Sequence, residues 1–338
     1  MRSLSKHALK KTDTPQRYSP NGEPVEPLKQ ALLILAGPTA SGKTAICLEI
    51  SKIIPVEMIS FDSMQVYRGM PIITQAPTAM EKKAMKAHLV SFLDISEVFD
   101  AARFRADAQS LIVKIFKRGR IPLLSGGTGL YLRALLDGLF DSEGGGRDEK
   151  LRKKLLIAQE KYGGSYLHEE LRAVDAPSAA TIHANDHRRL VRALEVHALS
   201  GAPISSRKLE RKGIREDFHC PVFFLERSRE DLYQRVEKRV DVMMSQGLEK
   251  EACRMLKKRL SMTASGALGL KEMRGWIEGR TSKEEAIRLL KQHTRNYAKR
   301  QISWFRHEKG RVTVSVDPAE KPKDTAKKIL LLWKNSEY

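Results

Sequence analysis

The amino-acid sequence predicts an α/β protein, with a mostly parallel sheet flanked by helices and interrupted by a helical insertion. Short apolar runs alternate with amphipathic helical patterns from residue 31 onward, as they do in parallel sheets. Residues 142–146 form a Gly-rich joint, and the charged, helical pattern that follows has little strand character. Strand character resumes at residues 222–225, so the helical part interrupts the α/β domain instead of following it.

The first predicted strand, residues 31–36, is a continuous apolar run, as expected for a parallel strand buried on both faces. A Gly-rich turn and a helical pattern through residues 46–53 follow it, and the second strand, 56–61, ends at Asp62. The remaining predicted elements are a helix at 104–116, a strand at 121–124, a helix at 130–139, a strand at 222–225, helices at 229–246 and 283–305, a strand at 312–316 and a helix at 319–333.

The predicted organisation has three parts. Residues 1–30 form a disordered basic tail, rich in proline. Residues 31–140 and 206–338 form the α/β core, and residues 141–205 form the helical insertion. No internal repeat is present in the sequence.

The charge of the chain indicates a polyanionic partner. Lys and Arg number 61 against 41 Asp and Glu, a formal net charge of +20. Nucleic acid accounts for such an excess, because each phosphate contacted by a cation releases counterions. A generally basic proteome is the alternative explanation.

The cysteines Cys47, Cys220 and Cys253 are scattered, which argues against a disulfide framework or a Cys-based zinc site and favours a reducing compartment. His183 and His187 are spaced i, i+4, but a helix start between them should keep them off one helix face. No apolar run approaches the ~20 residues of a membrane span. We therefore expect a cytoplasmic protein, with a mitochondrial presequence in the basic tail as the alternative.

The Gly-rich turn at residues 37–44 fits the phosphate-binding pattern G-x-x-x-x-G-K-[ST] between a strand and a helix, which makes it a P-loop. Loop amides and the helix N-terminus favour a diphosphate or triphosphate there, Lys43 adds a charge, and Thr44 offers a hydroxyl to Mg²⁺. The predicted phosphate-contacting residues are Gly37, Pro38, Thr39, Ala40, Ser41, Gly42, Lys43 and Thr44.

Most such loops belong to nucleotide-binding proteins, namely ATPases and kinases, which usually carry a metal-binding Asp at the end of another strand. Here the strand at 121–124 ends in Ser125-Gly126-Gly127, so no metal carboxylate is evident at that point.

Further motifs accompany the P-loop, at residues 62–69, 126–131, 185–195 and 295–306. Together with the loop they closely resemble the tRNA dimethylallyltransferases, also called isopentenyltransferases, and they stand in family order. The resemblance implies a P-loop NTPase-like fold related to nucleotide kinases. It also implies a prenyltransferase of tRNA modification that uses Mg²⁺. We expect the protein to be a monomer. The donor would be dimethylallyl diphosphate, and the acceptor the exocyclic N6 amine of the adenosine on the 3′ side of the anticodon.

Three segments depart from the family pattern. The family usually has G-T-A-K-P-T where residues 73–78 read Ile-Thr-Gln-Ala-Pro-Thr, and P-H-H-L-I-D where residues 86–91 read Lys-Ala-His-Leu-Val-Ser. The family's A-I-G-Y stands here as Ala-Leu-Gly-Leu at residues 267–270. These departures affect the substrate loops and leave the chemical centre intact.

The resemblance assigns chemistry to a few residues. Asp62, beyond a strand end, would take the amine proton as general base; the alternatives are a helix cap and a metal ligand. Thr128 would bond the target base or its surroundings, or else cap the next helix. Lys43 would stabilise the leaving diphosphate. Arg235 and Arg239, one helical turn apart, would clamp that diphosphate or form a solvated face paired with Asp231 and Glu237.

The insertion would clasp the anticodon arm of tRNA through a basic helix stripe. Arg192 could instead pair with Glu195 on its own helix. The expected tRNA-binding residues are Asp62, Ser63, Met64, Gln65, Thr128, Arg152, Arg188, Arg189, Leu190, Val191 and Arg192. Gln65 has the donor and acceptor needed to read an adenine edge. The basic residues of the 283–305 helix also suit RNA, whereas its aromatic residues have the spacing of core anchors.

Two other functions share some of these features. A small-molecule P-loop kinase would use ATP with Asp62 as base, but it leaves the basic segments unexplained. An RNA-binding GTPase-like switch would require a base-specificity motif such as N-K-x-D, which the sequence lacks.

Overall fold

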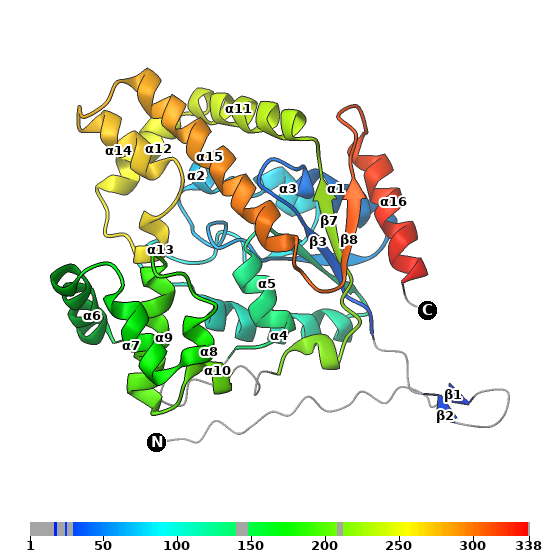
Figure 1. The fold of residues 1–338 in the computed structure, drawn as a ribbon. Helices are drawn as coiled ribbons and strands as arrows, with labels where there is room; N and C mark the ends of the chain where they lie inside the picture. Colours follow the sequence, from blue (N-terminus) through cyan, green and yellow to red (C-terminus); the bar gives the residue numbers. More distant parts are fainter. Residues whose placement is uncertain (1–16, 19–23, 26–29, 140–147, 208–211, 337–338) are drawn as a thin grey trace, which may run out of the picture.

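A computed structural model describes residues 17–18, 24–25, 30–139, 148–207 and 212–336 (Figure 1). At its centre lies a six-stranded sheet in the order β5-β4-β6-β3-β7-β8, in which every neighbouring pair is parallel. The sheet strands are β3 (Leu33–Ala36), β4 (Val56–Ser60), β5 (Ala87–His88), β6 (Ile121–Gly126), β7 (Val222–Glu226) and β8 (Arg311–Ser315).

Helices surround this sheet in three groups. Those of the first half are α1 (Lys43–Ile53), α2 (Pro71–Thr74), α3 (Ala79–Ala84), α4 (Ala101–Lys117) and α5 (Gly129–Leu136). The insertion contains α6 (Glu149–Tyr162), α7 (Tyr166–Val174), α8 (Ala176–Ala179), α9 (His187–Ser200) and α10 (Ile204–Arg207). The C-terminal part contains the 3₁₀ helix η2 (Ile214–Glu216), α11 (Arg229–Ser245), α12 (Leu248–Leu256), α13 (Met262–Ser265), α14 (Leu270–Ile277), α15 (Lys283–Phe305) and α16 (Pro322–Asn335).

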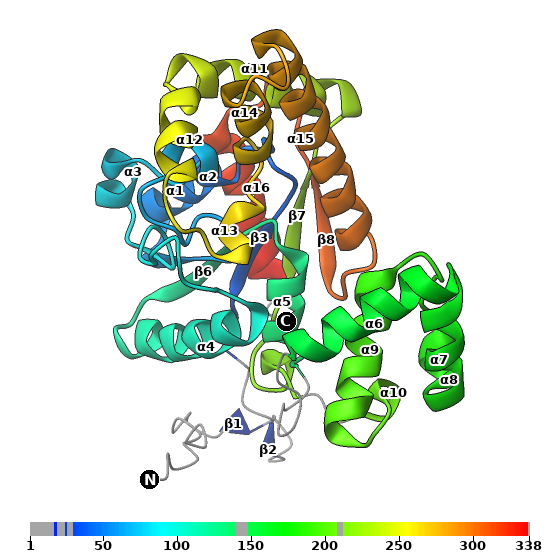
Figure 2. The same cartoon turned by 90° about the vertical axis from the view of Figure 1, so that its left-hand side faces the viewer.

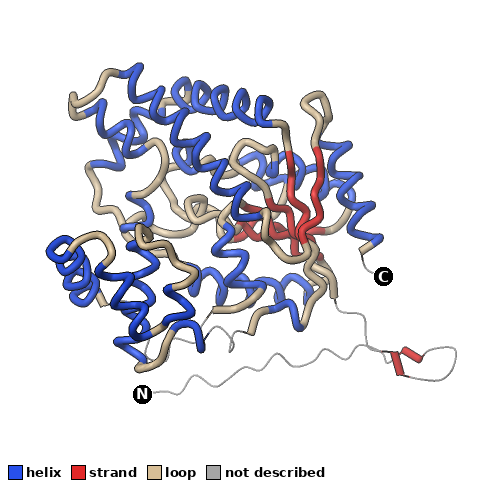
Figure 3. The backbone as a smooth tube through the Cα atoms, in the orientation of Figure 1, coloured by secondary structure: helices blue, strands red, loops and turns tan. Residues whose placement is uncertain are grey.

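The two faces of the sheet bury different cores because side chains alternate along each strand. Leu33 and Leu35 of β3 pack toward α1 and α16, whereas Leu32, Ile34 and Ala36 belong to the larger core beneath α4 and α5. Figure 3 shows the strands enclosed between helices. Both faces are therefore apolar, which explains why the first strand reads as an uninterrupted apolar run.

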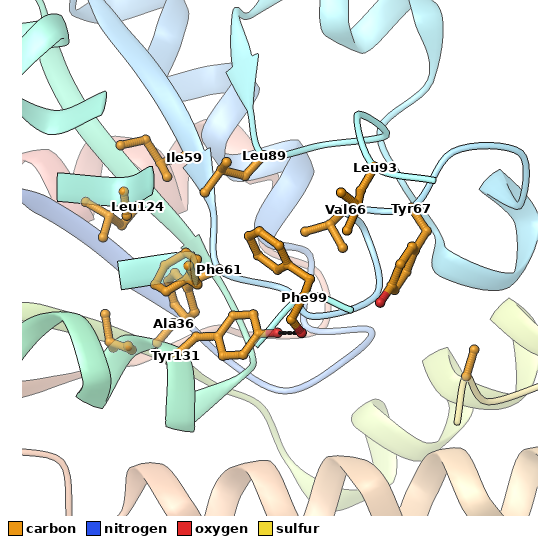
Figure 4. Packing of buried hydrophobic residues seen from close by; sticks show 14 of the residues in the cluster. Ala36, Ile59, Phe61, Val66, Tyr67, Leu89, Leu93, Phe99, Leu124 and Tyr131 are labelled. Atoms are coloured by element: carbon orange, nitrogen blue, oxygen red, sulfur yellow. Dashed lines mark hydrogen bonds between the residues drawn. The ribbon is translucent and has the colours of Figure 1, made fainter. Parts of the chain in front are cut away.

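An aromatic cluster supports the carboxyl end of β4 (Figure 4). Phe61, fully buried, lies directly before Asp62, and Tyr131 of α5 stacks on Phe104 of α4 at a centroid distance of 4.9 Å. The Tyr131 hydroxyl donates to the carbonyl of Phe99 at 2.8 Å. The backbone that carries Asp62 is thus held by well-packed rings.

The predicted elements are present, with shifted ends. β3 begins at Leu33, two residues later than predicted, β6 extends to Gly126, and α5 ends at Leu136 instead of 139. The helix predicted at 283–305 has those bounds. The short elements α2, α3 and β5 and the helices α12 to α14 were not predicted, because their apolar faces are set by tertiary partners such as the α12–α14 contact.

The insertion has its own small core, with Leu167, Leu171, Leu190 and Leu194 among its buried residues. Figure 2 shows α6 to α10 as a separate bundle beside the sheet, while α11, α12 and α14 lie at the opposite end of the view. Asp186 caps α9 through a hydrogen bond from Arg189 N at 3.2 Å, so His183 lies outside the helix that begins at His187, as predicted.

Most of the tail 1–30 lies outside the described residues, and so does the predicted Gly-rich joint at 142–146. Of the tail, Arg17–Tyr18 and Pro24–Val25 pair as a short antiparallel ladder, β1 and β2. Within the described ranges, no helix is both long and apolar enough to cross a membrane.

A buried carboxylate joins β4, β5 and α4 at the other end of the sheet. Arg118 donates to both oxygens of Glu57, at 3.0 and 2.6 Å, and His88 contacts Glu57 Oε2 at 2.7 Å. Burial by itself raises the pKa of Glu57, but the hydrogen bonds from Arg118 and His88 outweigh it and lower the pKa to about 2. Ionised Glu57 therefore stabilises the folded state.

We predict that Glu57→Gln lowers the free energy of unfolding at neutral pH by about 2 kcal/mol, because it leaves Arg118 without its carboxylate. Since the pKa of Glu57 is depressed on folding, the wild-type contribution should be lost as pH falls from ~4.5 toward 2 and should be missing from the variant. Urea unfolding at several pH values measures both effects. The matched control is Glu49→Gln, which removes the exposed pair with Lys52 and should change stability by less than ~0.5 kcal/mol. Equal losses for the two variants would contradict the prediction.

Candidate active site

The P-loop follows β3 and wraps around the ammonium group of its own lysine. Lys43 Nζ donates to the carbonyl oxygens of Gly37 at 2.9 Å and Pro38 at 2.8 Å. Gly42, with φ of 98°, and Ala40, with φ of 66°, both adopt the left-handed conformation that turns the loop back onto α1. The start of α1 therefore faces the loop, as an anion site requires.

Lys43 is unusually easy to deprotonate for a lysine. Desolvation by burial, followed by the charge of Arg239, lowers its pKa from 10.5 to about 8, against the opposing influence of Asp62 and Cys47. An anion that enters the loop would stabilise the charged form of this buried ammonium group, because opposite charges attract strongly where water is excluded.

Three arginines from β7–α11 contact consecutive residues of the loop. Arg227 Nε donates to Ser41 O at 2.9 Å, Arg235 Nε to Ala40 O at 3.2 Å, and Arg239 Nη1 to Thr39 Oγ1 at 2.9 Å.

Arg235 and Arg239 do not form the solvated helix face, paired with Asp231 and Glu237, that was the alternative to a diphosphate clamp. Asp231 pairs more closely with Arg227, at 2.9 Å, than with Arg235, at 3.9 Å, and Glu237 pairs with Arg295. Arg239 lies close enough to Lys43 and Asp62 to influence the pKa of Lys43 and to be influenced by Asp62 itself. The structure thus brings Arg235 and Arg239 to the loop, and it adds Arg227.

Asp62 lies beyond β4 and organises the turn that follows. Its Oδ1 accepts from Met64 N at 2.9 Å and more weakly from Gln65 N at 3.4 Å, so the capping alternative describes one of its oxygens. Neither hydrogen bond uses Oδ2. One carboxylate can therefore hold the turn with one oxygen and face a reactant with the other.

The Gln65 side chain is engaged within the protein. Its Oε1 accepts from Ser60 Oγ at 3.0 Å, and its Nε2 donates to Gln75 O at 3.0 Å. These bonds use the groups with which Gln65 was predicted to read an adenine edge, so in this conformation it braces the loop before α3.

Thr128 faces Asp62's turn and not the helix that it precedes. Ser63 N donates to Thr128 Oγ1 at 3.1 Å, and within the described structure the Thr128 hydroxyl makes no capping bond to α5. Tyr297 of α15 interacts with Thr128, and burial followed by the charge of Asp62 raises the pKa of its phenol. Asp62, Thr128 and Tyr297 are thus neighbours around one turn.

The glycines beside Thr128 admit protein atoms. A Cβ at Gly126 would lie 2.7 Å from the backbone of Phe61, and one at Gly129 would lie 2.1 Å from the Trp304 ring. The close approach that glycine allows in this turn is therefore used for packing against β4 and α15.

In the insertion, the side chains of two residues predicted to bind tRNA face the protein interior, so any contact with RNA would have to use their backbone. Leu190 and Val191 are buried, at 0% and 5% exposure, in the insertion's own core, because they lie on the inward face of α9. Arg188 and Arg189 are exposed on the same helix, and Arg189 pairs with Asp186 at 3.2 Å.

Arg152 and Arg192 meet at a buried carboxylate. Arg152 donates to both oxygens of Glu195 at 2.8 Å, and Arg192 Nη1 donates at 2.6 Å, as its alternative predicted. Burial raises the pKa of Glu195, but these two arginines outweigh it and bring the pKa to about 2. Glu149 also acts on Arg152, so these two arginines are largely balanced by acidic groups within the insertion.

Sequence reasoning missed Arg227, Tyr297 and Gln301. Gln301 contacts both the P-loop and the Gly127 carbonyl. Tyr297 and Gln301 belong to the motif at 295–306, which was the available signal, whereas Arg227 stands alone after β7.

A divalent cation fits the loop only in company with a ligand. Among the described residues, no group of three His, Cys, Asp or Glu could hold a metal by itself. Thr44 lies in the first turn of α1, next to Lys43. Mg²⁺ usually takes few protein ligands and completes its shell with phosphate oxygens and water, so a hydroxyl beside a phosphate loop suits it.

Comparison with known proteins points to one family. The family described as IPP transferase matches residues 65–308. The tRNA dimethylallyltransferase of Geobacter metallireducens is 43% identical over 282 residues, covering 83% of this chain and 91% of that protein. That of Moorella thermoacetica is 40% identical over 297 residues, covering 86% and 91%.

Solved structures agree. The full-length tRNA isopentenylpyrophosphate transferase of Bacillus halodurans has a TM-score of 0.65 at 36% identity, covering 91% of this chain and 98% of that one. A eukaryotic dimethylallyltransferase acting on tRNA has a TM-score of 0.77 at 27% identity, covering 90% and 79%.

We predict that binding of an alkyl diphosphate weakens as pH rises through about 8. Lys43 is charged below that pH and neutral above it, so affinity should fall by up to tenfold per pH unit. Calorimetric titration between about pH 7 and pH 9.5 measures this. Lys43→Arg stays charged throughout and should lack the pH dependence, although it binds more weakly at pH 7. A wild-type affinity that stays constant across this range would show that Lys43 does not supply the charge.

Proposed function

The chain belongs to the tRNA dimethylallyltransferase (IPP transferase) family, and from this premise we propose how its site performs the transfer. The enzyme is a transferase of tRNA modification. We propose that it moves the dimethylallyl group from dimethylallyl diphosphate to the N6 amine of the adenosine on the 3′ side of the anticodon. The observation that carries the proposal is the junction of a cation-lined P-loop with the turn of Asp62 and Thr128.

The P-loop side suits the donor. As the allylic C–O bond breaks, diphosphate leaves with the bonding electrons and gains negative charge. Lys43, Arg235 and Arg239 converge on the loop. The partial positive charge at the start of α1 also stabilises an anion there. We assign the donor diphosphate to residues 37–44 with these arginines.

Asp62 suits the acceptor. The adenine amine is a weak nucleophile because its lone pair is delocalised into the ring, so a base that removes its proton as the N–C bond forms assists the reaction. Oδ1 holds the turn, which fixes the carboxylate, and Oδ2 accepts the proton in our proposal. Thr128 and Tyr297 lie beside Asp62 and, in our proposal, orient the target adenine.

Mg²⁺ is the expected cofactor, and the Thr44 hydroxyl would hold it together with the donor's phosphate oxygens. Bound there, the ion would neutralise charge on the leaving group. The residues present fit this role, because they supply a hydroxyl at the phosphate loop and leave the remaining positions to the donor and water.

The insertion is assigned to tRNA. Arg188 and Arg189 present exposed charges, while Arg152 and Arg192 lie nearby, bound to Glu195. These cations suit phosphates of an anticodon arm. The target base must leave its stack to reach Asp62, which costs a few kcal/mol, and the clasp offsets that cost.

We also propose a cytoplasmic monomer. Cys47, Cys220 and Cys253 are scattered along the sequence with no C-x-x-C pair, which suits a reducing compartment. The chain supplies both the P-loop and the turn of Asp62, so the site needs no second copy to be complete.

Mass spectrometry of nucleosides from tRNA incubated with enzyme, Mg²⁺ and dimethylallyl diphosphate tests the function. We expect N6-isopentenyladenosine in the anticodon loop. Turnover of ATP without prenyl transfer would instead support a small-molecule kinase, the second function that a P-loop with a nearby Asp can serve.

Asp62→Asn should lower kcat by roughly 10²-fold or more and leave donor and tRNA affinity within a few-fold. The amide oxygen still accepts from Met64 N, so the turn is kept while the base is lost. Asp62→Ala removes both functions and should also lower thermal stability. Single-turnover kinetics with bound tRNA make the comparison, and near-normal turnover of the Asn variant would exclude Asp62 as base.

Replacing Arg188 and Arg189 together by Gln should weaken tRNA binding and flatten the log–log salt dependence by about one to two units. Arg192 is left intact, because its removal would strip Glu195 of a partner. Donor affinity should not change. The control replaces Lys321 and Lys323, exposed around the start of α16, and should leave the slope unchanged. An unaltered slope in the Arg188/Arg189 variant would mean that these residues form a solvated face only.

A further inference from the structure

Gln301 occupies the junction between the P-loop and the turn that carries Thr128. Its Oε1 accepts from Thr39 N at 2.8 Å, and its Nε2 donates to Gly127 O at 2.9 Å. The side chain is 5% exposed, so neither hydrogen bond is readily replaced by water. Both ends of one planar amide are thus fixed to two different loops.

From Gln301, further contacts lead through each loop toward a group with a proposed role in the reaction. Thr39 is also held by Arg239, through its hydroxyl at 2.9 Å, so the amide and the guanidinium fix the same loop residue. On the other side, Gly127 precedes Thr128, whose Oγ1 accepts from Ser63 N at 3.1 Å, next to Asp62. A continuous line of contacts therefore runs from the donor loop to the base.

The packing leaves no space for a side chain at Gly127 beside this amide. A Cβ on Gly127 would lie 2.2 Å from Gln301 Nε2 and 3.1 Å from the carbonyl oxygen of Gly37. The two loops approach closely at this point, and glycine is the residue that permits it. The close fit supports a defined separation of the two loops.

The helix that carries Gln301 is itself anchored on both sides. Ala298, one turn earlier, is buried with Ala40 of the P-loop and with Leu232 and Val236 of α11. Trp304, nearly one turn later, lies against Gly129. Gln301 therefore projects from a fixed part of α15.

We propose that Gln301 is a positioning residue for the transfer: its amide holds the donor loop and the acceptor turn at the separation that brings the allylic carbon to the adenine amine. This inference rests on the proposed function, since it assigns the two loops to the two substrates. Misplacing reactants by about 1 Å can cost about 10²-fold in rate even when each still binds. The role is distinct from contact with either substrate.

The test uses Gln301→Met, which keeps the volume of the side chain but loses both hydrogen bonds, in the full-length enzyme. We expect kcat to fall at least tenfold, while KM for dimethylallyl diphosphate and for tRNA stay within about threefold and the melting temperature falls by only a few degrees. Ser303→Ala, exposed on the same helix, is the matched control and should behave as wild type.

A second variant keeps the amide and displaces it. Gly127→Ala should show the same loss in kcat, and the double variant should lose little more than either single one, because both act on the same bridge. Unchanged kcat in Gln301→Met, a parallel rise in KM, or additive losses would overturn the proposal. Wild-type enzyme that transfers no prenyl group would instead refute the proposed function, so the two failures are distinguishable.

Discussion

The parallel pairing of β6 with both β3 and β4 is the constraint on which the site depends. Ala36 pairs with Gly126 and Ser60 with Ser125, so the three strands end at the same level of the sheet. The segments that follow them, namely the P-loop, the turn of Asp62 and the Gly-rich turn of Thr128, must then lie at one edge. Strand order thus brings together the proposed donor and acceptor sites, which are separate in sequence.

The P-loop at this edge of the sheet is surrounded by an excess of positive charge, which favours an anionic ligand. Lys43 and three arginines crowd one loop, and desolvation by burial, followed by repulsion among these cations, lowers the pKa values of Lys43, Arg235 and Arg239. Backbone carbonyls of the loop accept hydrogen bonds from these cations in the meantime. Such an arrangement costs stability in the free protein and would strengthen binding of the proposed donor diphosphate.

In the insertion, a carboxylate pairs with part of the positive charge. Glu195 binds Arg152 and Arg192 and joins the start of α6 to α9, while Leu190 and Val191 fill the core beneath. The same helix therefore builds the insertion with one face and offers Arg188 and Arg189 to solvent with another. The sequence pattern of a basic stripe does not distinguish an arginine in an internal ion pair from one that binds RNA, because both are the same residue type.

Sequence by itself determined the parts of this protein whose chemistry is local. The P-loop, the apolar strands, Asp62 at a strand end and the long helix at 283–305 follow from contiguous patterns, since turn geometry and hydrophobic periodicity act over a few residues. Tertiary structure alone decided what meets them. Gln301 reaches Thr39 across 262 positions, and Arg227 reaches Ser41 across 186. No local pattern encodes such contacts, because they depend on how α11 and α15 pack over the sheet, and packing is a property of the whole buried core.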